Sequence, residues 1–138
     1  MPTEIISGLW LGDINDSLNK SFLKDNLIDI LINCTTNYGY IDSIETKKLR
    51  IPLSYNLLPG TDLILLKKNH DKIVSFILKN IESSNILIFC NDGLRISPLI
   101  IALFLIKYGE ISKDNIRSIL RSKNEKICFD VDLSDFTS

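Results

Sequence analysis

The chain has 138 residues, of which 45% are hydrophobic and 24% charged, and its formal net charge is −1 at pH 7. This length predicts one domain, residues 1–138, with enough apolar side chains to form a core. A nearly neutral charge argues against a general binder of nucleic acid or of anionic membranes. The longest apolar run, Pro98 to Tyr108, is well short of the roughly 20 residues that span a bilayer.

The three cysteines, Cys34, Cys90 and Cys128, are odd in number and widely spaced. They fit neither a disulfide framework nor a zinc site, so we expect no metal and no cofactor. Free thiols suit a reducing, intracellular compartment, and the opening "MPTEIISGLW" lacks the features of a secretory signal. The sequence therefore predicts a cytoplasmic protein.

The first half of the chain predicts three strands, at residues 5–11, 27–34 and 49–53. After the first strand we expect a turn at Gly12 and Asp13, then a helix capped by Asp16 or Ser17. The second run, "LIDILINC", is almost continuously apolar and rich in β-branched residues, which is typical of a strand buried on both faces. The third leads into a loop that contains Tyr55.

The second half predicts a long helix from Thr61 or Asp62, because apolar residues recur there every three or four positions. Residues 85–90 form the next buried strand, and a helix begins at Ser97 and Pro98. A last helix is expected within "SKDNIRSILRS", capped by Ser112. Strands that alternate with helices predict the α/β class, with a central, mostly parallel sheet flanked by helices.

The stretch "FCNDGLRIS" places Cys90 between a buried strand and the start of a helix. In sheets of this kind, ligands bind beyond the carboxyl ends of the strands, where the free N–H groups of helix N-termini attract anions. We therefore expect the loop amides to form an anion pocket that stabilises a thiolate. Ser97 has two predicted roles, as the helix N-cap and as a hydroxyl donor to the sulfur.

The same stretch resembles the His-Cys-x-x-Gly-x-x-Arg-Ser loop of the small dual-specificity protein phosphatases, with ungapped matches at Cys90, Gly93 and Ser97. Three further segments, "GLWLGD", "ILINCT" and "RIPL", are similar to strands of that family and follow in the same order. The resemblance covers roughly residues 4–121. It implies a cysteine-phosphatase fold in a single domain.

Several positions depart from the family pattern. Ile96 occupies the place of the arginine that holds the phosphoryl oxygens, and Phe89 replaces the histidine before the cysteine. Tyr55 occupies the place of the general-acid aspartate, and Asp92 adds a carboxylate to a loop that binds a dianion. The loss of an oxyanion donor costs about 10²–10³ in rate, and the loss of a general acid costs about 10²–10⁴ more.

The resemblance therefore implies a catalytically degraded member, a pseudophosphatase in which Cys90 is a vestigial nucleophile. We predict an intracellular binding or scaffolding protein that engages a phosphoprotein or another protein partner. The degenerate phosphate loop is expected to comprise Asn91, Asp92, Gly93, Leu94 and Ile96, with Phe89 and Tyr55 beside it.

Two alternatives remain open. A shifted loop that brings Arg95 into the place of the missing arginine makes the chain a weakly active tyrosine or dual-specificity phosphatase; otherwise Arg95 is expected to pair with Asp92. "CNDGLR" also resembles the Cys-x-x-Gly-x-Arg loop of rhodanese-like sulfurtransferases, in which the cysteine carries a persulfide. The chain lacks the Asp-x-Arg and Gly-His-Ile-x-Gly-Ala stretches of that family.

Overall fold

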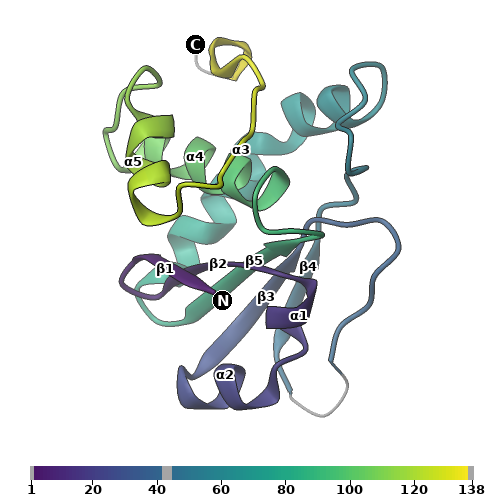
Figure 1. Ribbon diagram of the computed structural model, residues 1–138, viewed down its shortest axis with the longest axis vertical. Helices are drawn as coiled ribbons and strands as arrows, with labels where there is room; N and C mark the ends of the chain where they lie inside the picture. Colours follow the sequence, from purple (N-terminus) through teal and green to yellow (C-terminus); the bar gives the residue numbers. More distant parts are fainter. Residues whose placement is uncertain (1, 42–44, 137–138) are drawn as a thin grey trace.

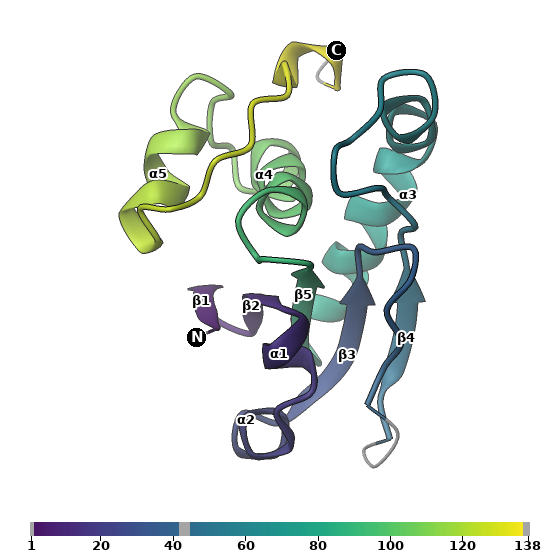
Figure 2. The same ribbon diagram turned by 45° about the vertical axis from the view of Figure 1, so that its right-hand side comes forward.

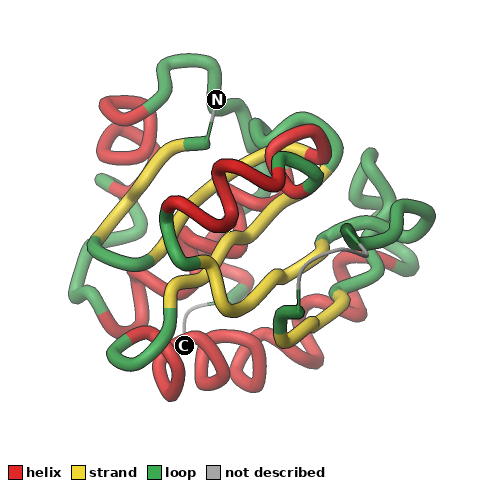
Figure 3. Tube along the Cα trace, turned by 90° about the horizontal axis from the view of Figure 1, so that it is seen from below, coloured by secondary structure: helices red, strands yellow, loops and turns green. Residues whose placement is uncertain are grey.

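The computed structural model describes residues 2–41 and 45–136, and it contains one sheet with helices on both faces (Figures 1 and 3). The strands are β1 (Thr3–Ile6), β2 (Leu9–Asp13), β3 (Ile28–Asn33), β4 (Lys47–Arg50) and β5 (Asn85–Cys90). They lie in the order β1-β2-β5-β3-β4; β1 is antiparallel to β2, and the other neighbours are parallel. The predicted α/β class with a mostly parallel sheet is confirmed.

The helices are α1 (Ile14–Ser17), α2 (Lys20–Asp25), α3 (Asp62–Ile81), α4 (Ile96–Tyr108) and α5 (Ile116–Lys123), followed by the short 3-10 helix η1 (Leu133–Asp135). Helices α3, α4 and α5 lie on one side of the sheet, and α2 lies on the other (Figure 2). The larger apolar core lies beneath α3 and α4. A smaller one, against α2, includes Leu23 and Phe89, with Trp10 and Phe22 packed edge-to-face at its margin.

The N-terminal segment differs from its prediction. The predicted single strand is a hairpin of β1 and β2, because the chain reverses at Gly8, whose φ of +84° a residue without a side chain adopts easily. The predicted cap at Asp16 or Ser17 is also wrong. Asp13 caps α1, and its side chain and that of Asp16 accept each other's backbone N–H at 2.8 and 2.9 Å. A separate cap, Asn19, begins α2.

Strand β4 and helix α5 also differ from their predicted bounds. Strand β4 covers Lys47–Arg50 and not residues 49–53, because Leu53 donates its N–H back to the Ile51 carbonyl at 2.8 Å, and this tight turn around Pro52 takes the chain out of the ladder. Helix α5 begins after Asn115 and not at Ser112. Ser112 instead accepts the backbone N–H groups of Asp114 and Asn115 and so forms the turn before the helix.

Three strand ends meet at the point where the loop after β5 begins. Cys90 lies opposite Asp13 of β2, and Phe89 lies opposite Asn33 of β3. The loop therefore leaves the middle of the sheet at the carboxyl ends of parallel strands, and then enters α4 (Figure 2). This is the place where ligands of open α/β sheets bind.

Candidate functional site: the Cys90 loop

The Cys90 loop, residues 90–96, joins β5 to α4 and depends on a close contact between two glycines. Gly93 has a φ of +70°, and a Cβ atom built there lies 3.0 Å from the carbonyl carbon and oxygen of Gly12. Both the backbone conformation and the lack of space therefore require glycine at position 93. Gly12, predicted only as part of a turn, lies within β2, and its backbone carbonyl packs against the loop at Gly93.

The Cys90 thiol lies at the base of the loop and is 1% exposed. Its sulfur is 3.1 Å from the Ser97 hydroxyl, and it accepts the Ser97 backbone N–H at 3.3 Å. Ser97 lies inside the first turn of α4 and does not cap it; the residue at the N-cap is Arg95, which makes no side-chain capping bond. Of the two roles predicted for Ser97, the structure shows the contact with sulfur.

A carboxylate of the loop itself binds one of the loop amides. Asp92 accepts the backbone N–H of Leu94 at 2.9 Å, and the same oxygen lies 3.9 Å from the Cys90 sulfur. The other Asp92 oxygen accepts the Tyr55 hydroxyl at 2.7 Å. This hydrogen bond and the charge of Asp92 raise the pKa of the Tyr55 phenol above its ordinary value. Arg95 stacks on Tyr55, with its guanidinium carbon 5.6 Å from the ring centre, so the predicted Arg95–Asp92 pair is replaced by Tyr55–Asp92.

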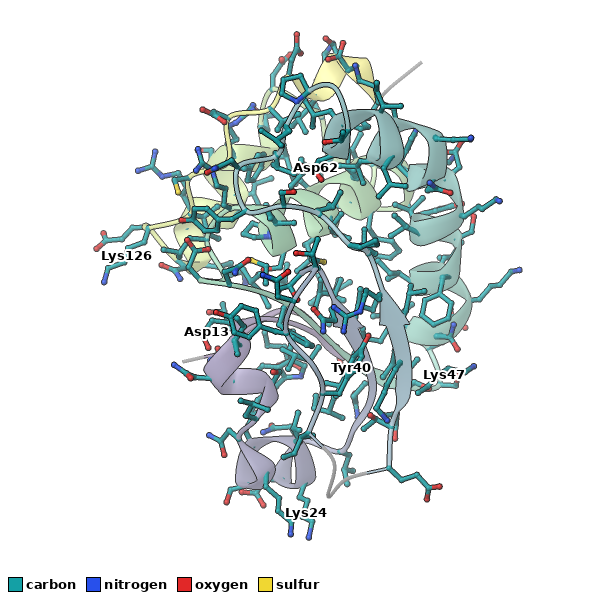
Figure 4. The ribbon with its side chains drawn as sticks, turned by 90° about the vertical axis from the view of Figure 1, so that its right-hand side faces the viewer. Asp13, Lys24, Tyr40, Lys47, Asp62 and Lys126 are labelled. Carbon is teal, nitrogen blue, oxygen red and sulfur yellow. The ribbon has the colours of Figure 1, made fainter. Side chains whose placement is uncertain are left out.

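The Tyr55 loop is held in place by Asp62, which the sequence suggested only as a helix cap. Asp62 is buried, and its carboxylate accepts the backbone N–H groups of Ser54 and Leu58 at 3.0 and 2.8 Å. It lies at the start of α3 (Figure 4). The Asp62 carboxylate therefore holds the loop that carries Tyr55, and none of these hydrogen bonds involves the Cys90 loop.

Two predicted site residues are part of the core. Ile96 is fully buried in the larger apolar core, where it begins α4. Phe89 is fully buried in the smaller core on the opposite face of the sheet and packs edge-on against Tyr40, with ring centres 6.3 Å apart. Neighbouring side chains of a strand point to opposite faces, so Phe89 is directed away from the face that holds Cys90.

The remaining loop residues are half-buried. Asn91 lies at the edge of a cavity of about 210 Å³, and Leu94 accepts the backbone N–H of Cys128 at 2.9 Å, which fixes the C-terminal segment beside the loop. The cavity is lined by Thr35, Thr36, Asn37, Tyr38, Leu53, Ser54, Tyr55 and Asn91. It opens beside the loop that carries Asp92, and its polar lining consists of hydroxyl and amide groups.

The far wall of this cavity depends on residues that the sequence did not indicate. Asn33 accepts both the backbone N–H and the hydroxyl of Thr35, at 3.0 and 2.6 Å. Arg50 donates to the carbonyl oxygens of Thr35 and Tyr38, at 2.9 and 2.7 Å. The guanidinium of Arg50 thus orders the segment after β3. No local sequence pattern indicates this role of Arg50, because Tyr38 and Thr35 lie 12 and 15 residues from it along the chain.

Cys34 is a second thiol at this end of the sheet. Its N–H donates to the Phe89 carbonyl oxygen at 2.9 Å, which places it directly after β3 and beside the end of β5. Burial raises the pKa of the Cys34 thiol well above its ordinary value, and the neighbouring Cys90 adds to this effect. The Cys34 thiol therefore stays protonated near neutral pH. The third cysteine, Cys128, lies at the surface.

Residues 9–134 match the family model of the dual specificity phosphatase catalytic domain. The chain belongs to this family. It is 28% identical over 131 residues to mouse dual specificity protein phosphatase 8 and 29% identical over 132 residues to the human phosphatase 16, and each alignment covers 91% of this chain. The chain spans only 18% of the length of each of these relatives. The family match favours the phosphatase interpretation of the Cys90 loop over the rhodanese-like one.

Solved structures show the same fold. The human tyrosine phosphatase-like serine/threonine/tyrosine-interacting protein superposes with a TM-score of 0.78 at 15% identity, over 94% of this chain and 88% of that one. Among the described residues of this family member, no helix has the length and apolar character needed to cross a bilayer. The same residues contain no cluster of three or more histidine, cysteine, aspartate or glutamate side chains suited to a metal ion.

Proposed function

We propose that this chain is a catalytically disabled dual-specificity phosphatase domain that acts inside the cell by binding a protein partner. The observation that supports this most strongly is the Asp92 carboxylate. It accepts the Leu94 amide of the loop and lies 3.9 Å from the Cys90 sulfur. The chain thus supplies its own anion to the loop that holds a substrate phosphate in active members of the family.

The charge of Asp92 opposes a phosphate dianion. Two unit charges 4 Å apart repel by about 1 kcal/mol in water and by about 4 kcal/mol near a protein surface, and a dianion doubles these values. The Leu94 amide is already engaged, so an incoming phosphate must also displace the carboxylate to reach it. We therefore expect millimolar or weaker affinity for phosphate, sulfate or tungstate.

The groups needed for turnover are also missing or differently used. Ile96, at the arginine position, is buried in the core, and Arg95 stacks on the Tyr55 ring. Tyr55, at the general-acid position, has a phenol whose pKa is raised by its hydrogen bond to Asp92, so it is a poor proton donor to a leaving group near neutral pH. Each loss costs about two or more orders of magnitude in rate.

A binding role agrees with these features. The proposed ligand is a phosphoprotein or an unmodified protein, since the residues that line the cavity beside Asn91 carry no formal charge and offer hydroxyl and amide groups. One protein of the same fold is named a phosphatase-like interacting protein, which associates this architecture with interaction in that case.

The test is hydrolysis of a generic aryl phosphate by the purified chain and by Cys90→Ser. An aryl phosphate has a good leaving group, so the assay tolerates a missing general acid and reports mainly on the missing arginine. We expect the two proteins to give the same rate. Turnover that disappears in Cys90→Ser contradicts the proposal.

The alternative of a weakly active phosphatase has one observation in its favour: the 3.1 Å contact between Cys90 and Ser97, which suits a supported thiolate. In that case Arg95 must leave Tyr55 and reach the phosphate. Arg95→Ala distinguishes the two functions in the same assay. Activity that depends on both Cys90 and Arg95 establishes the alternative, and activity that depends on neither supports a disabled domain.

A further inference from the structure

Strand β4 forms one edge of the sheet in the described part of the chain, and its partner there is β3. Just beyond β4, Ile51 donates its N–H to the Asn33 carbonyl at 2.9 Å, toward β3. Backbone groups alternate in direction along a strand, so the N–H and C=O groups of Lys48 and Arg50 point away from β3. These groups are available to pair with another extended chain.

A groove runs beside this edge, between β4 and α3. It has a volume of about 390 Å³, and its walls are mainly apolar: Leu49, Ile51, Pro52, Leu65, Ile73 and Phe76. Lys72 of α3 is a basic residue in its lining; Arg50 also borders it, but the Arg50 guanidinium lies on the other face of β4. Lys47 lies on the same side, with its ammonium 5.9 Å from the centre of the Phe76 ring (Figure 4).

The other face of β4 is cationic. The ammonium of Lys48 and the guanidinium carbon of Arg50 lie 5.8 and 5.5 Å from the centre of the Tyr40 ring. Tyr40 packs against the smaller core, on the face of the sheet opposite α3. Figure 4 shows Tyr40 and Lys47 on opposite sides of β4. A strand added at this edge meets the apolar groove with one face and two cations with the other.

We propose that the free edge of β4 and its groove bind an extended segment of a protein partner in which apolar and acidic residues alternate. Side chains of a strand alternate between faces, so the apolar ones enter the groove and the acidic ones lie over Lys48 and Arg50. Main-chain hydrogen bonds supply affinity, and the alternating contacts supply specificity. The site does not use the Cys90 loop, so this inference stands or falls independently of the catalytic state.

A second copy of this chain fits the edge poorly. Strand β4 reads Lys-Lys-Leu-Arg, and two such edges bring like charges opposite each other, which destabilises a strand pair. The same cations attract a partner strand that carries carboxylates on the matching face. The charge of the edge thus selects against self-pairing and for an acidic partner.

The probe is a fluorescein-labelled synthetic peptide in which valine and glutamate alternate over about eight positions, a usual strand length. Its binding to the whole chain is followed by fluorescence anisotropy. A second peptide has the same composition but groups all the valines before all the glutamates. We expect the alternating peptide to bind at least tenfold more tightly. Equal affinity of the two peptides means charge attraction alone and overturns the proposal, as does a lack of saturable binding by the alternating peptide.

Variants of β4 separate main-chain pairing from charge. Lys48→Pro removes an outward N–H at an edge position, where proline is tolerated, and Lys48→Ala removes the same charge but keeps the N–H. We expect Lys48→Pro to bind at least tenfold more weakly than Lys48→Ala. Equal binding by the two folded variants overturns the proposal.

Groove variants give an independent test if Lys48→Pro does not fold. Phe76 lines the groove, whereas Leu78, on the same helix, is 41% exposed and does not line it. We expect Phe76→Ala to weaken binding about fivefold or more and Leu78→Ala to leave it unchanged. Equal effects of the two changes overturn the proposal. Dimerisation of the chain through this edge, measured by sedimentation, also overturns the proposal. A dimer of that kind should become more stable in Lys48→Glu, because the change places opposite charges across the two edges.

Discussion

The floor and the mouth of the Cys90 loop differ in what holds them. The floor consists of Gly12, Gly93, Cys90 and Ser97, which make backbone and buried contacts. The mouth consists of Asp92, Tyr55 and Arg95, whose side chains contact one another at the surface. The floor agrees with the phosphatase pattern, and the mouth departs from it.

This difference shows which parts of the Cys90 loop the fold itself requires. A side chain at position 93 strains the backbone and collides with β2, so packing requires glycine there whether or not the loop is catalytic. Packing does not constrain the side chains at the mouth in this way, because a substitution of an exposed residue usually changes the free energy of unfolding by less than about 0.5 kcal/mol. Ile96 is an exception: it departs from the motif that the loop resembles, and it is buried in the core.

The largest expected effect is therefore at the floor. Gly93→Ala forces a side chain into a left-handed conformation and against the Gly12 carbonyl, so we expect a loss of about 2–4 kcal/mol in the free energy of unfolding. Urea denaturation measures it. Gly60→Ala is the matched control, since a Cβ atom there meets nothing within 4 Å. Similar unfolding curves for the two variants show that the loop does not depend on this contact.

At the mouth, we expect a change in affinity and not in folding. Asp92→Ala removes the carboxylate that occupies the Leu94 amide, and it should increase tungstate affinity at least tenfold, or about 1.4 kcal/mol. Isothermal calorimetry on the folded variant measures this. Asp25→Ala, an equal change of charge on α2, is the control. Micromolar binding of tungstate by the unsubstituted chain contradicts the proposal that Asp92 opposes anion binding in this loop.

The smallest effect concerns the Tyr55–Asp92 hydrogen bond, which raises the pKa of Tyr55 in the folded protein. A raised pKa means that the bond stabilises the fold at pH values below the ordinary tyrosine pKa of about 10, and that this contribution is lost as pH rises through the folded value. Asp92→Asn should lower the pKa of Tyr55 toward its ordinary value. Ultraviolet titration of tyrosinate, with Tyr55→Phe to identify the signal, measures the shift. An unchanged titration shows that the two side chains do not interact in solution.

The sequence by itself determined the elements whose signals are local. The apolar run at residues 85–90 and the three-to-four-residue spacing after Asp62 predict β5 and α3, and both are present. The order of strands and helices predicts the α/β class, and "FCNDGLRIS" locates the loop between β5 and α4. Such patterns depend on neighbours along the chain, so they can be recognised without knowledge of the fold.

Only the tertiary structure decided which distant groups meet. Asp92 and Tyr55 are 37 residues apart, and the sequence instead suggested the nearby Arg95 as the partner of Asp92. The support of Gly93 by Gly12, and the position of Cys34 beside Cys90, depend on strand order and register. Register is set by the burial of whole faces and by turn geometry, so no short stretch of sequence contains it. The loop and the Asp92 carboxylate in it were therefore predictable from the sequence, but the partner of that carboxylate was not.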